Sequence, residues 1–240
     1  MRTWEPPKYG GIMCNVGFKC NFYVEHSNIG DDYFRDRTIL LYYHDTRVIK
    51  ILQIIKDSPI ETLMNREEKL QLGTLLQDVS NLKGDMAEVG TYLGGTARVM
   101  CECEPNKKLY TFDTFEGIPE AGEHDDEKIY TEGRYASNYE QTIENLKGYN
   151  VEIVKGDFRD TCETIKDKKF SFVHLDVDLY DTTMFCLEFF YPRMVAGGII
   201  LSHDYQNNQG VNKAINEFFE GKETVISLLG SQGLIVRGKE

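Results

Sequence analysis

The sequence predicts an α/β protein built on a mostly parallel β-sheet. From about residue 83 onward, short apolar runs alternate with stretches of helical spacing, which is the βαβ rhythm of a parallel sheet. The last two runs are separated by only the four residues 230–233, so they should pair as an antiparallel hairpin, because a parallel crossover needs a longer connection. Together these observations indicate a doubly wound, Rossmann-like sheet that ends in a hairpin.

Two helical segments precede the first predicted strand. Apolar residues over 31–57 approximate helical spacing, and a second helix is predicted over about 66–82. We expect residues 1–82 to form an N-terminal extension and helical cap, and residues 83–240 to form the core of the same structural domain. A length of 240 residues suits a single α/β domain.

The predicted strands are short runs of apolar residues bounded by polar residues and glycine. They cover residues 86–89, 109–112, 151–154, 170–175, 199–201, 224–229 and 234–236. Because ligands of open α/β sheets bind outside the carboxyl ends of the strands, the loops that follow these runs are where a functional site is expected.

Composition excludes several functional classes. Lysine and arginine total 27 against 39 acidic residues, and the net charge of -12 argues against nucleic acid or an anionic membrane surface as a partner. No run approaches the roughly 18 consecutive apolar residues of a membrane span, and the N-terminus lacks a signal-like apolar run. Six cysteines are too few for a disulfide scaffold, so we expect thiols and a cytoplasmic protein.

A glycine-rich turn ends the first strand and opens a helix, with Glu88, Gly90, Tyr92, Gly94 and Thr96 at its chief positions. Such a turn lets bare backbone approach a ligand. The dinucleotide fingerprint requires a glycine where Tyr92 stands, which disfavours NAD. Glu88 instead suits a ligand that carries an ammonium group, such as the methionine part of S-adenosylmethionine (SAM).

Two further strand ends carry residues suited to an adenosyl group. Asp113 lies nineteen positions after Gly94, where a carboxylate can accept hydrogen bonds from both ribose hydroxyls. Asp157 follows the third strand and could meet the adenine edge, while Phe158 or Phe115 packs on the ring. A glycine-rich turn alone can be a packing turn, but three matching strand ends favour a bound cofactor.

Five motifs occur in order along the predicted sheet. They are EVGTYLGGT (88–96), FDTFEGIP (112–119), GDFRDT (156–161), LDVDLY (175–180) and GGIILSHDY (197–205). This series resembles the macrocin O-methyltransferase family over about residues 63–237. The resemblance implies a class I methyltransferase sheet, SAM, and magnesium or another divalent cation as cofactors. It also implies a small-molecule hydroxylated acceptor, a glycoside of natural product biosynthesis.

Carboxylates at two strand ends could hold the cation. Asp176 and Asp178 follow the strand at 170–175, and Asp204 follows the next strand, so both loops should open on one edge of the sheet. The resemblance implies Asp176 and Asp204 as metal ligands, Asp176 also beside the cofactor, and Asp178 as general base. Helix capping is the alternative for Asp178.

His203 departs from the family pattern, because relatives commonly carry a further aspartate there. The departure leaves an imidazole ligand, a different metal preference or a weakened site. His203 could equally be the general base, or a structural histidine. His174 lies within a predicted strand and is expected to be packed or hydrogen-bonded rather than catalytic.

The polar segment 118–135 follows the second strand end, and we expect it to form a mobile lid in which His124 and Tyr130 could touch the acceptor. A solvated surface insertion is the alternative. Cys101 and Cys103 do not form a CxxC redox pair and should be buried apolar residues. The aromatic residues over 185–191 are expected in the core or at a subunit interface.

Two other functions remain open at this point. One is an NAD-dependent or nucleotide-sugar oxidoreductase on a similar sheet, against which Tyr92 argues. The other is a non-catalytic SAM-binding protein. This alternative is suggested by His203, which stands at a position where relatives usually carry a carboxylate. Apolar residues in the N-terminal helices could form a homo-oligomer or merely cover the sheet.

Overall fold

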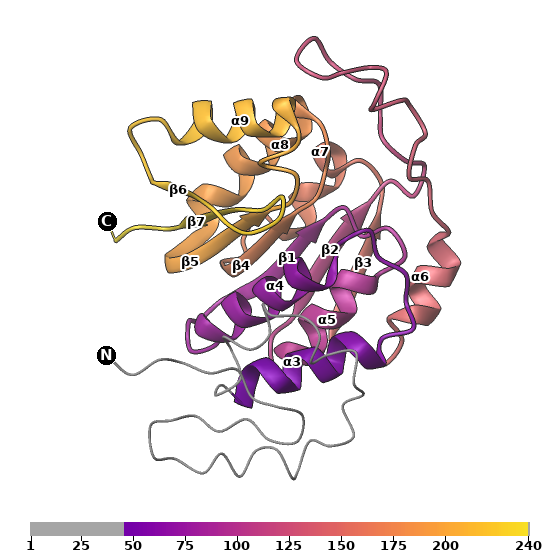
Figure 1. Ribbon diagram of the computed structural model, residues 1–240, viewed down its shortest axis with the longest axis vertical. Helices are drawn as coiled ribbons and strands as arrows, with labels where there is room; N and C mark the ends of the chain where they lie inside the picture. Colours follow the sequence, from indigo (N-terminus) through magenta and orange to yellow (C-terminus); the bar gives the residue numbers. More distant parts are fainter. Residues whose placement is uncertain (1–45, 240) are drawn as a thin grey trace, which may run out of the picture. The chain divides into compact units, whose positions relative to one another are not determined.

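A seven-stranded sheet forms the centre of the computed structural model, which describes residues 46–239 (Figure 1). The strands are β1 (Asp85–Val89), β2 (Leu109–Asp113), β3 (Val151–Lys155), β4 (Phe170–Leu175), β5 (Met194–Ser202), β6 (Val225–Ser227) and β7 (Gly233–Val236). Their spatial order is β3-β2-β1-β4-β5-β7-β6. The first five strands are parallel, and β7 is antiparallel to both β5 and β6. The predicted fold class is confirmed, including the terminal hairpin.

The direction of winding reverses between β1 and β4. From β1 the chain proceeds outward to β2 and β3, and it then returns to place β4 on the other side of β1. The crevice outside such a reversal is where open α/β sheets bind their ligands. The fold therefore brings the loops after β1 and β4 together before any particular side chain is considered.

Strand β5 is longer and β6 is shorter than predicted. Strand β5 starts at Met194, whereas the sequence pattern predicts a start at Ile199. The prediction fails here because two adjacent glycines, Gly197 and Gly198, are typical of a strand end or a bulge. The structure carries the strand through both glycines, with a register irregularity against β4 between Phe170 and Phe172. Edge strand β6 pairs over only three residues.

Helices cover both faces of the sheet. One face packs against α3 (Thr46–Asp57), α4 (Arg66–Asp78) and α5 (Gly95–Cys103), and the other packs against α7 (Phe158–Thr161), α8 (Tyr180–Phe190) and α9 (Gln209–Phe219). Helix α6 (Tyr139–Asn145) and the 3₁₀ turns η2 (Cys162–Ile165) and η3 (Tyr191–Arg193) complete the described elements. Each face buries its own apolar cluster, as expected of a three-layer α/β fold.

Capping contacts and helix propensity set the two ends of helix α4. Helix α4 starts with a capping box, in which Asn65 accepts from the Glu68 backbone N–H while the Glu68 carboxylate accepts from the Asn65 backbone N–H. It ends at Asp78, four residues short of the prediction, before the weak helix formers Ser80 and Asn81. Of the helix predicted over 31–57, residues 31–45 lie outside the described part of the chain.

The described helices are short amphipathic or buried segments. Among residues 46–239, no helix has both the length and the apolar character needed to cross a membrane. Phe189 and Phe190 lie in the core, as predicted. Phe158 stacks on Phe190 at a centroid distance of 5.1 Å, so these aromatic rings tie α7 to α8.

Four described cysteines are buried free thiols. Cys101 and Cys103 project from α5 into the apolar cluster beneath the sheet, which confirms their expected role as apolar residues. Burial, reinforced by neighbouring glutamates, raises the pKa of both thiols to about 12. Thiolates are therefore disfavoured at these positions at neutral pH.

Alkylation of the folded protein should spare Cys101, Cys103 and Cys186. Their burial and raised pKa values keep the reactive thiolate scarce. Iodoacetamide treatment at pH 8, followed by peptide mass spectrometry, should label them only after unfolding in urea. Rapid labelling of Cys101 in the folded protein would contradict this packing.

Candidate active site

A cavity of about 350 Å³ opens at the carboxyl edge of the sheet. Its walls come from the residues that follow each of the first five strands, together with Leu63 ahead of α4 and the start and end of the segment after β2. Of the predicted site residues, nine line this cavity: Gly90, Tyr92, Asp113, Asp157, Phe158, Asp176, Asp178, His203 and Asp204. Four do not: Glu88, Gly94, Thr96 and Phe115.

Gly90 is the point of closest approach between the loops after β1 and β4. It has a φ of 93°, and a Cβ atom there would lie 1.9 Å from the backbone oxygen of Asp176. Only glycine fits both constraints. The Asp176 backbone N–H in turn donates to the Val89 carbonyl at 2.9 Å, so the two loops are joined directly.

The carboxylate of Asp113 organises the glycine-rich turn. It accepts hydrogen bonds from the backbone N–H groups of Thr91, Tyr92 and Phe115 at 2.8, 2.7 and 2.7 Å. Burial raises the pKa of Asp113, against the lowering effect of these hydrogen bonds. Asp113 also lines the cavity, where it could reach a bound ligand. Its contact with ribose hydroxyls stays a prediction.

Three predicted site residues outside the lining support the cavity from behind its wall. Gly94 begins α5 in a left-handed conformation and lies against Leu146. Thr96 faces Thr62, with the two hydroxyl oxygens 3.1 Å apart. Phe115 is buried against Tyr139, with ring centroids 4.9 Å apart.

The side chain of Glu88 is buried within the sheet, where it contacts polar side chains of the two neighbouring strands. Its carboxylate lies 3.3 Å from His174 Nδ1 and accepts from the Thr111 hydroxyl at 3.2 Å, and neither Glu88 nor His174 has any solvent exposure. Burial raises the pKa of Glu88. His174 is packed and hydrogen-bonded, as predicted.

Asp157 and Phe158 form the wall after β3. Asp157 caps α7 by accepting from the Arg159 backbone N–H at 2.8 Å, and it also pairs with the Arg159 guanidinium. The ring of Phe158 packs edge-on against Phe112 at 4.9 Å. These residues offer the cavity a carboxylate and an aromatic surface side by side.

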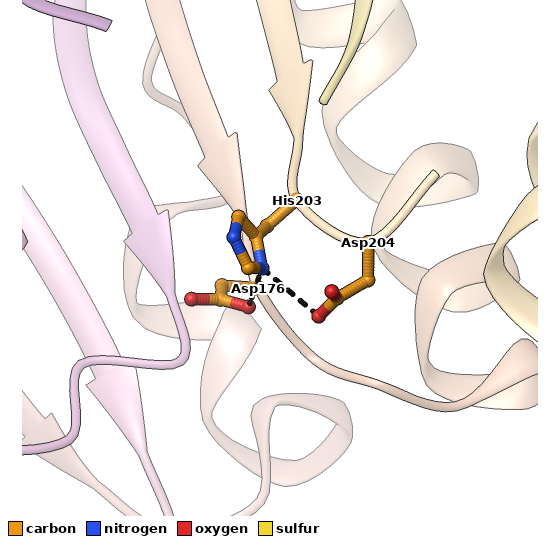
Figure 2. Close-up of side chains that lie close together, drawn as sticks. All are labelled: Asp176, His203 and Asp204. Carbon is orange, nitrogen blue, oxygen red and sulfur yellow. Dashed lines mark hydrogen bonds and ion pairs between the residues drawn. The ribbon is translucent and has the colours of Figure 1, made fainter. Parts of the chain in front are cut away.

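An acidic cluster with one imidazole lies at the ends of β4 and β5 (Figure 2). His203 Nδ1 is 2.9 Å from Asp204 Oδ2 and 3.2 Å from Asp176 Oδ1. Each side chain is largely withdrawn from solvent, with 12% exposure for His203, 16% for Asp204 and 25% for Asp176. The structure therefore brings together the three residues that were predicted as metal ligands.

A fourth carboxylate, missed by the sequence analysis, completes this cluster. Glu68 Oε2 lies 3.2 Å from His203 Nε2, on the side of the ring away from Asp176 and Asp204. Burial favours a raised pKa, but hydrogen bonds from His203 and Ser231 lower the pKa of Glu68 to about 2. The local signal, glutamate three residues after Asn65, indicated only a capping box.

The carboxylates of the cluster repel one another unless a positive charge lies among them. Burial opposes a charge on His203, yet the surrounding carboxylates of Asp176, Asp204 and Glu68 raise its pKa far above the ordinary value. Burial, with the nearby Asp176 and Asp204, raises the pKa of Asp178 to about 8. A proton or a metal ion among these groups would relieve the repulsion between them.

The donor set fits a divalent cation. Adjacent ligand atoms around an ion with bonds of about 2.1 Å lie about 3.0 Å apart at right angles. The separations of 2.9 and 3.2 Å from His203 Nδ1 to the Asp204 and Asp176 oxygens match this spacing. Two carboxylates and one imidazole could thus ligate one ion.

The predicted lid segment lines the cavity only with its two ends. Between them the segment projects beyond the sheet (Figure 1). Its ends are held by hydrogen bonds of 2.8 and 2.9 Å that join Ile118 to Arg134 and Gly133. Its tip is held by Asp125, which accepts from the Tyr180 backbone N–H at the start of α8 at 3.0 Å. These contacts fix one position of the segment, and its mobility stays a prediction.

The two lid residues named as acceptor contacts differ in their surroundings. Burial and the carboxylates of Asp204 and Asp178 raise the pKa of Tyr130 to about 12, and Tyr130 is not among the residues that line the cavity. His124 instead packs on Tyr180 at 4.4 Å and contacts Lys213. His124 therefore secures the segment to α8 and α9.

The fold and this arrangement of loops define a class I methyltransferase-like protein. Residues 59–228 match the model of the family described as macrocin-O-methyltransferase (TylF), so the chain belongs to this family. Its members are SAM-dependent O-methyltransferases, and the prediction of such an enzyme is confirmed at the level of the family. The match leaves no support for the oxidoreductase alternative.

Similar proteins include two from streptomycetes. The chain is 27% identical over 155 residues to demethyldecarbamoylnovobiocin O-methyltransferase of Streptomyces niveus, covering 58% of this chain and 59% of the relative. It is 28% identical over 185 residues to 8-demethyl-8-(2,3-dimethoxy-alpha-L-rhamnosyl)-tetracenomycin-C 4'-O-methyltransferase of Streptomyces olivaceus, covering 64% of this chain and 70% of the relative. The structure of the O-methyltransferase NovP has a TM-score of 0.63 at 21% identity, covering 85% of this chain and all of that one, which shows a shared fold.

Replacing Gly90 by alanine should cost more stability than the same change at Gly148. Both glycines have a positive φ, but a Cβ at Gly148 meets nothing within 4 Å, whereas at Gly90 it meets the Asp176 carbonyl. Backbone strain alone should cost about 1–2 kcal/mol in Gly148→Ala, and the clash should add to this in Gly90→Ala. Urea unfolding measures both; equal losses would contradict the close approach of the two loops.

Proposed function

We propose that this chain transfers the methyl group of SAM to a hydroxyl of a sugar on a small molecule, with help from a divalent cation. Family membership supports the methyl transfer. The observation that carries the proposal is that the glycine-rich turn and the acidic cluster open on one cavity. A methyl donor and a cation-held hydroxyl could therefore meet there.

The half of the cavity after β1, β2 and β3 is suited to SAM. The turn at Gly90 presents bare backbone, and Asp113 and Asp157 supply carboxylates beside the apolar ring of Phe158. A carboxylate suits ribose hydroxyls, and an aromatic ring suits adenine. Glu88 acts one step further away in this proposal, because its side chain is buried beneath the turn.

The half of the cavity formed by the loops after β4 and β5 is suited to the cation and the acceptor. Asp176, Asp204 and His203 would hold a divalent cation, which supplies a Lewis acid that orients the acceptor hydroxyl and lowers its pKa. Asp178 lines the cavity beside them, and its pKa of about 8 lies close enough to neutral pH for its ionised form to take the hydroxyl proton.

The proposed transfer is an in-line displacement. As the acceptor oxygen forms its bond to the methyl carbon, the sulfur–carbon bond breaks and the hydroxyl proton passes to an oxygen of Asp178. S-adenosylhomocysteine and the methyl ether are the products. The protein contributes alignment of oxygen, carbon and sulfur and the placement of the base.

The apolar side chains at the opening of the cavity suit a glycoside acceptor. Leu63 and Tyr135 both line it and remain 55% and 38% exposed, which leaves an apolar rim. Aromatic and aliphatic side chains can cover the apolar face of a sugar ring or of an attached aglycone. The name of the Streptomyces olivaceus relative specifies methylation of a rhamnosyl group, which supports the same acceptor class here.

Substitutions at Asp204 and Asp113 should separate the two halves of the cavity. Asp204→Ala should abolish the stimulation of transfer by a divalent cation and leave SAM affinity nearly intact, because Asp204 belongs to the acidic cluster. Asp113→Ala should weaken SAM binding by about 1–3 kcal/mol, through lost hydrogen bonds and a loosened turn.

Calorimetry with SAM and a methyl-transfer assay with and without cation measure both variants. Asp160→Ala, at an exposed position on α7 outside the cavity lining, serves as the matched control and should behave as the unaltered protein. Full cation stimulation in Asp204→Ala would remove that residue from the proposed mechanism, and an unchanged SAM affinity in Asp113→Ala would remove Asp113 from the cofactor site.

A further inference from the structure

The contacts of Glu68 fix the orientation of the His203 ring. Glu68 Oε1 accepts from the Ser231 N–H at 2.9 Å and from the Ser231 hydroxyl at 2.8 Å. Glu68 Oε2 accepts from the Asn65 N–H at 3.1 Å and lies 3.2 Å from His203 Nε2. The Glu68 side chain is only 5% exposed, so these partners take the place of water. The carboxylate is thus held from three sides.

This arrangement fixes a hydrogen on Nε2 of His203 and leaves Nδ1 to a proton or a metal ion. An ionised carboxylate can only accept hydrogen bonds, so Nε2 must donate to Glu68. In a neutral imidazole the lone pair is then on Nδ1, which faces Asp204 and Asp176 at 2.9 and 3.2 Å. A lone pair toward two carboxylates is repulsive unless a cation lies among them.

The same geometry occurs in carboxylate–histidine–metal arrangements, in which the second ring nitrogen donates to a carboxylate and the first nitrogen ligates the ion. Imidazole nitrogen suits first-row transition metals, whereas magnesium is bound mainly by oxygen. One nitrogen ligand beside Asp176 and Asp204 therefore changes which cation the site favours.

We propose that Glu68 is a positioning residue that holds His203 as an Nδ1 ligand, and that the site consequently favours manganese or another transition-metal ion over magnesium. This inference rests on the proposed function, because it takes the acidic cluster as the cation site of the methyl transfer. It assigns Glu68, on α4, a part in selecting the cation.

The direct test is pulsed EPR of the full chain loaded with Mn²⁺. A coupling from a directly bound ¹⁴N nucleus should appear in the unaltered protein and disappear in His203→Asp, which replaces the nitrogen ligand by oxygen. In Glu68→Gln the coupling should weaken or shift, because the side-chain amide no longer holds the ring as a charged acceptor. Absence of the coupling in the unaltered protein, with Mn²⁺ bound, would overturn the proposal.

Titration calorimetry with Mn²⁺ and Mg²⁺ measures the preference in the same proteins. The ratio of the two affinities should fall at least about tenfold in His203→Asp, and Glu68→Gln should lose about 10–100-fold in Mn²⁺ affinity. Glu67→Gln, at the adjacent position on α4 where the carboxylate pairs with Arg66, is the matched control and should change neither value. An unchanged affinity ratio in His203→Asp would overturn the cation preference.

Folding and cofactor binding are followed in parallel. Glutamine is accepted at the third position of a capping box, so Glu68→Gln should keep α4 intact, and thermal unfolding checks this. If Glu68→Gln fails to fold, the ¹⁴N coupling of the unaltered protein and the results for His203→Asp still decide whether Nδ1 is a ligand and whether it sets the cation preference.

SAM calorimetry on the unaltered protein separates this inference from the proposed function. Bound SAM with no bound cation would mean that a proton occupies Nδ1 instead, which overturns the inference and the cation's part in the proposed function but leaves SAM-dependent methyl transfer standing. A failure to bind SAM would count against the proposed function itself.

Discussion

Repulsion among carboxylates at the ends of β4 and β5 is the constraint on which the site depends. Asp176, Asp204 and Glu68 surround one imidazole within 3.2 Å, in a region that is largely withdrawn from water. Such a group is stable only with positive charge among its members. This requirement for positive charge makes the cluster a candidate cation site. Burial, together with the same nearby carboxylates, also raises the pKa of Asp178.

The fold holds this cluster beside the cofactor half of the cavity through backbone geometry. Winding reverses between β1 and β4, so the loops after these strands are neighbours. Gly90 then allows the turn after β1 to touch the Asp176 carbonyl, and Asp113 ties that turn to β2. Buried side chains beneath the edge, above all the Glu88–His174 pair, support these loops without lining the cavity.

The βαβ periodicity predicted the sheet, its terminal hairpin and the strand-end acids, because apolar runs and glycine-rich turns are local signals. It could not predict which face a strand-end side chain takes, so Glu88 was expected at the cofactor and lies in the sheet interior. It also missed Glu68, whose contact with His203 joins residues 135 positions apart and whose local pattern indicates a helix cap. The length of β5 was misjudged because a glycine pair usually interrupts a strand.

The central claim is that one cavity holds the methyl donor and the cation side by side. Paramagnetic broadening measures this directly, with SAM that carries ¹³C in its methyl group and Mn²⁺ added to the complex. The account predicts that the methyl resonance of bound SAM broadens strongly when the ion is added and sharpens again when magnesium in excess displaces it. A methyl resonance that stays sharp while both SAM and Mn²⁺ are bound would contradict the account.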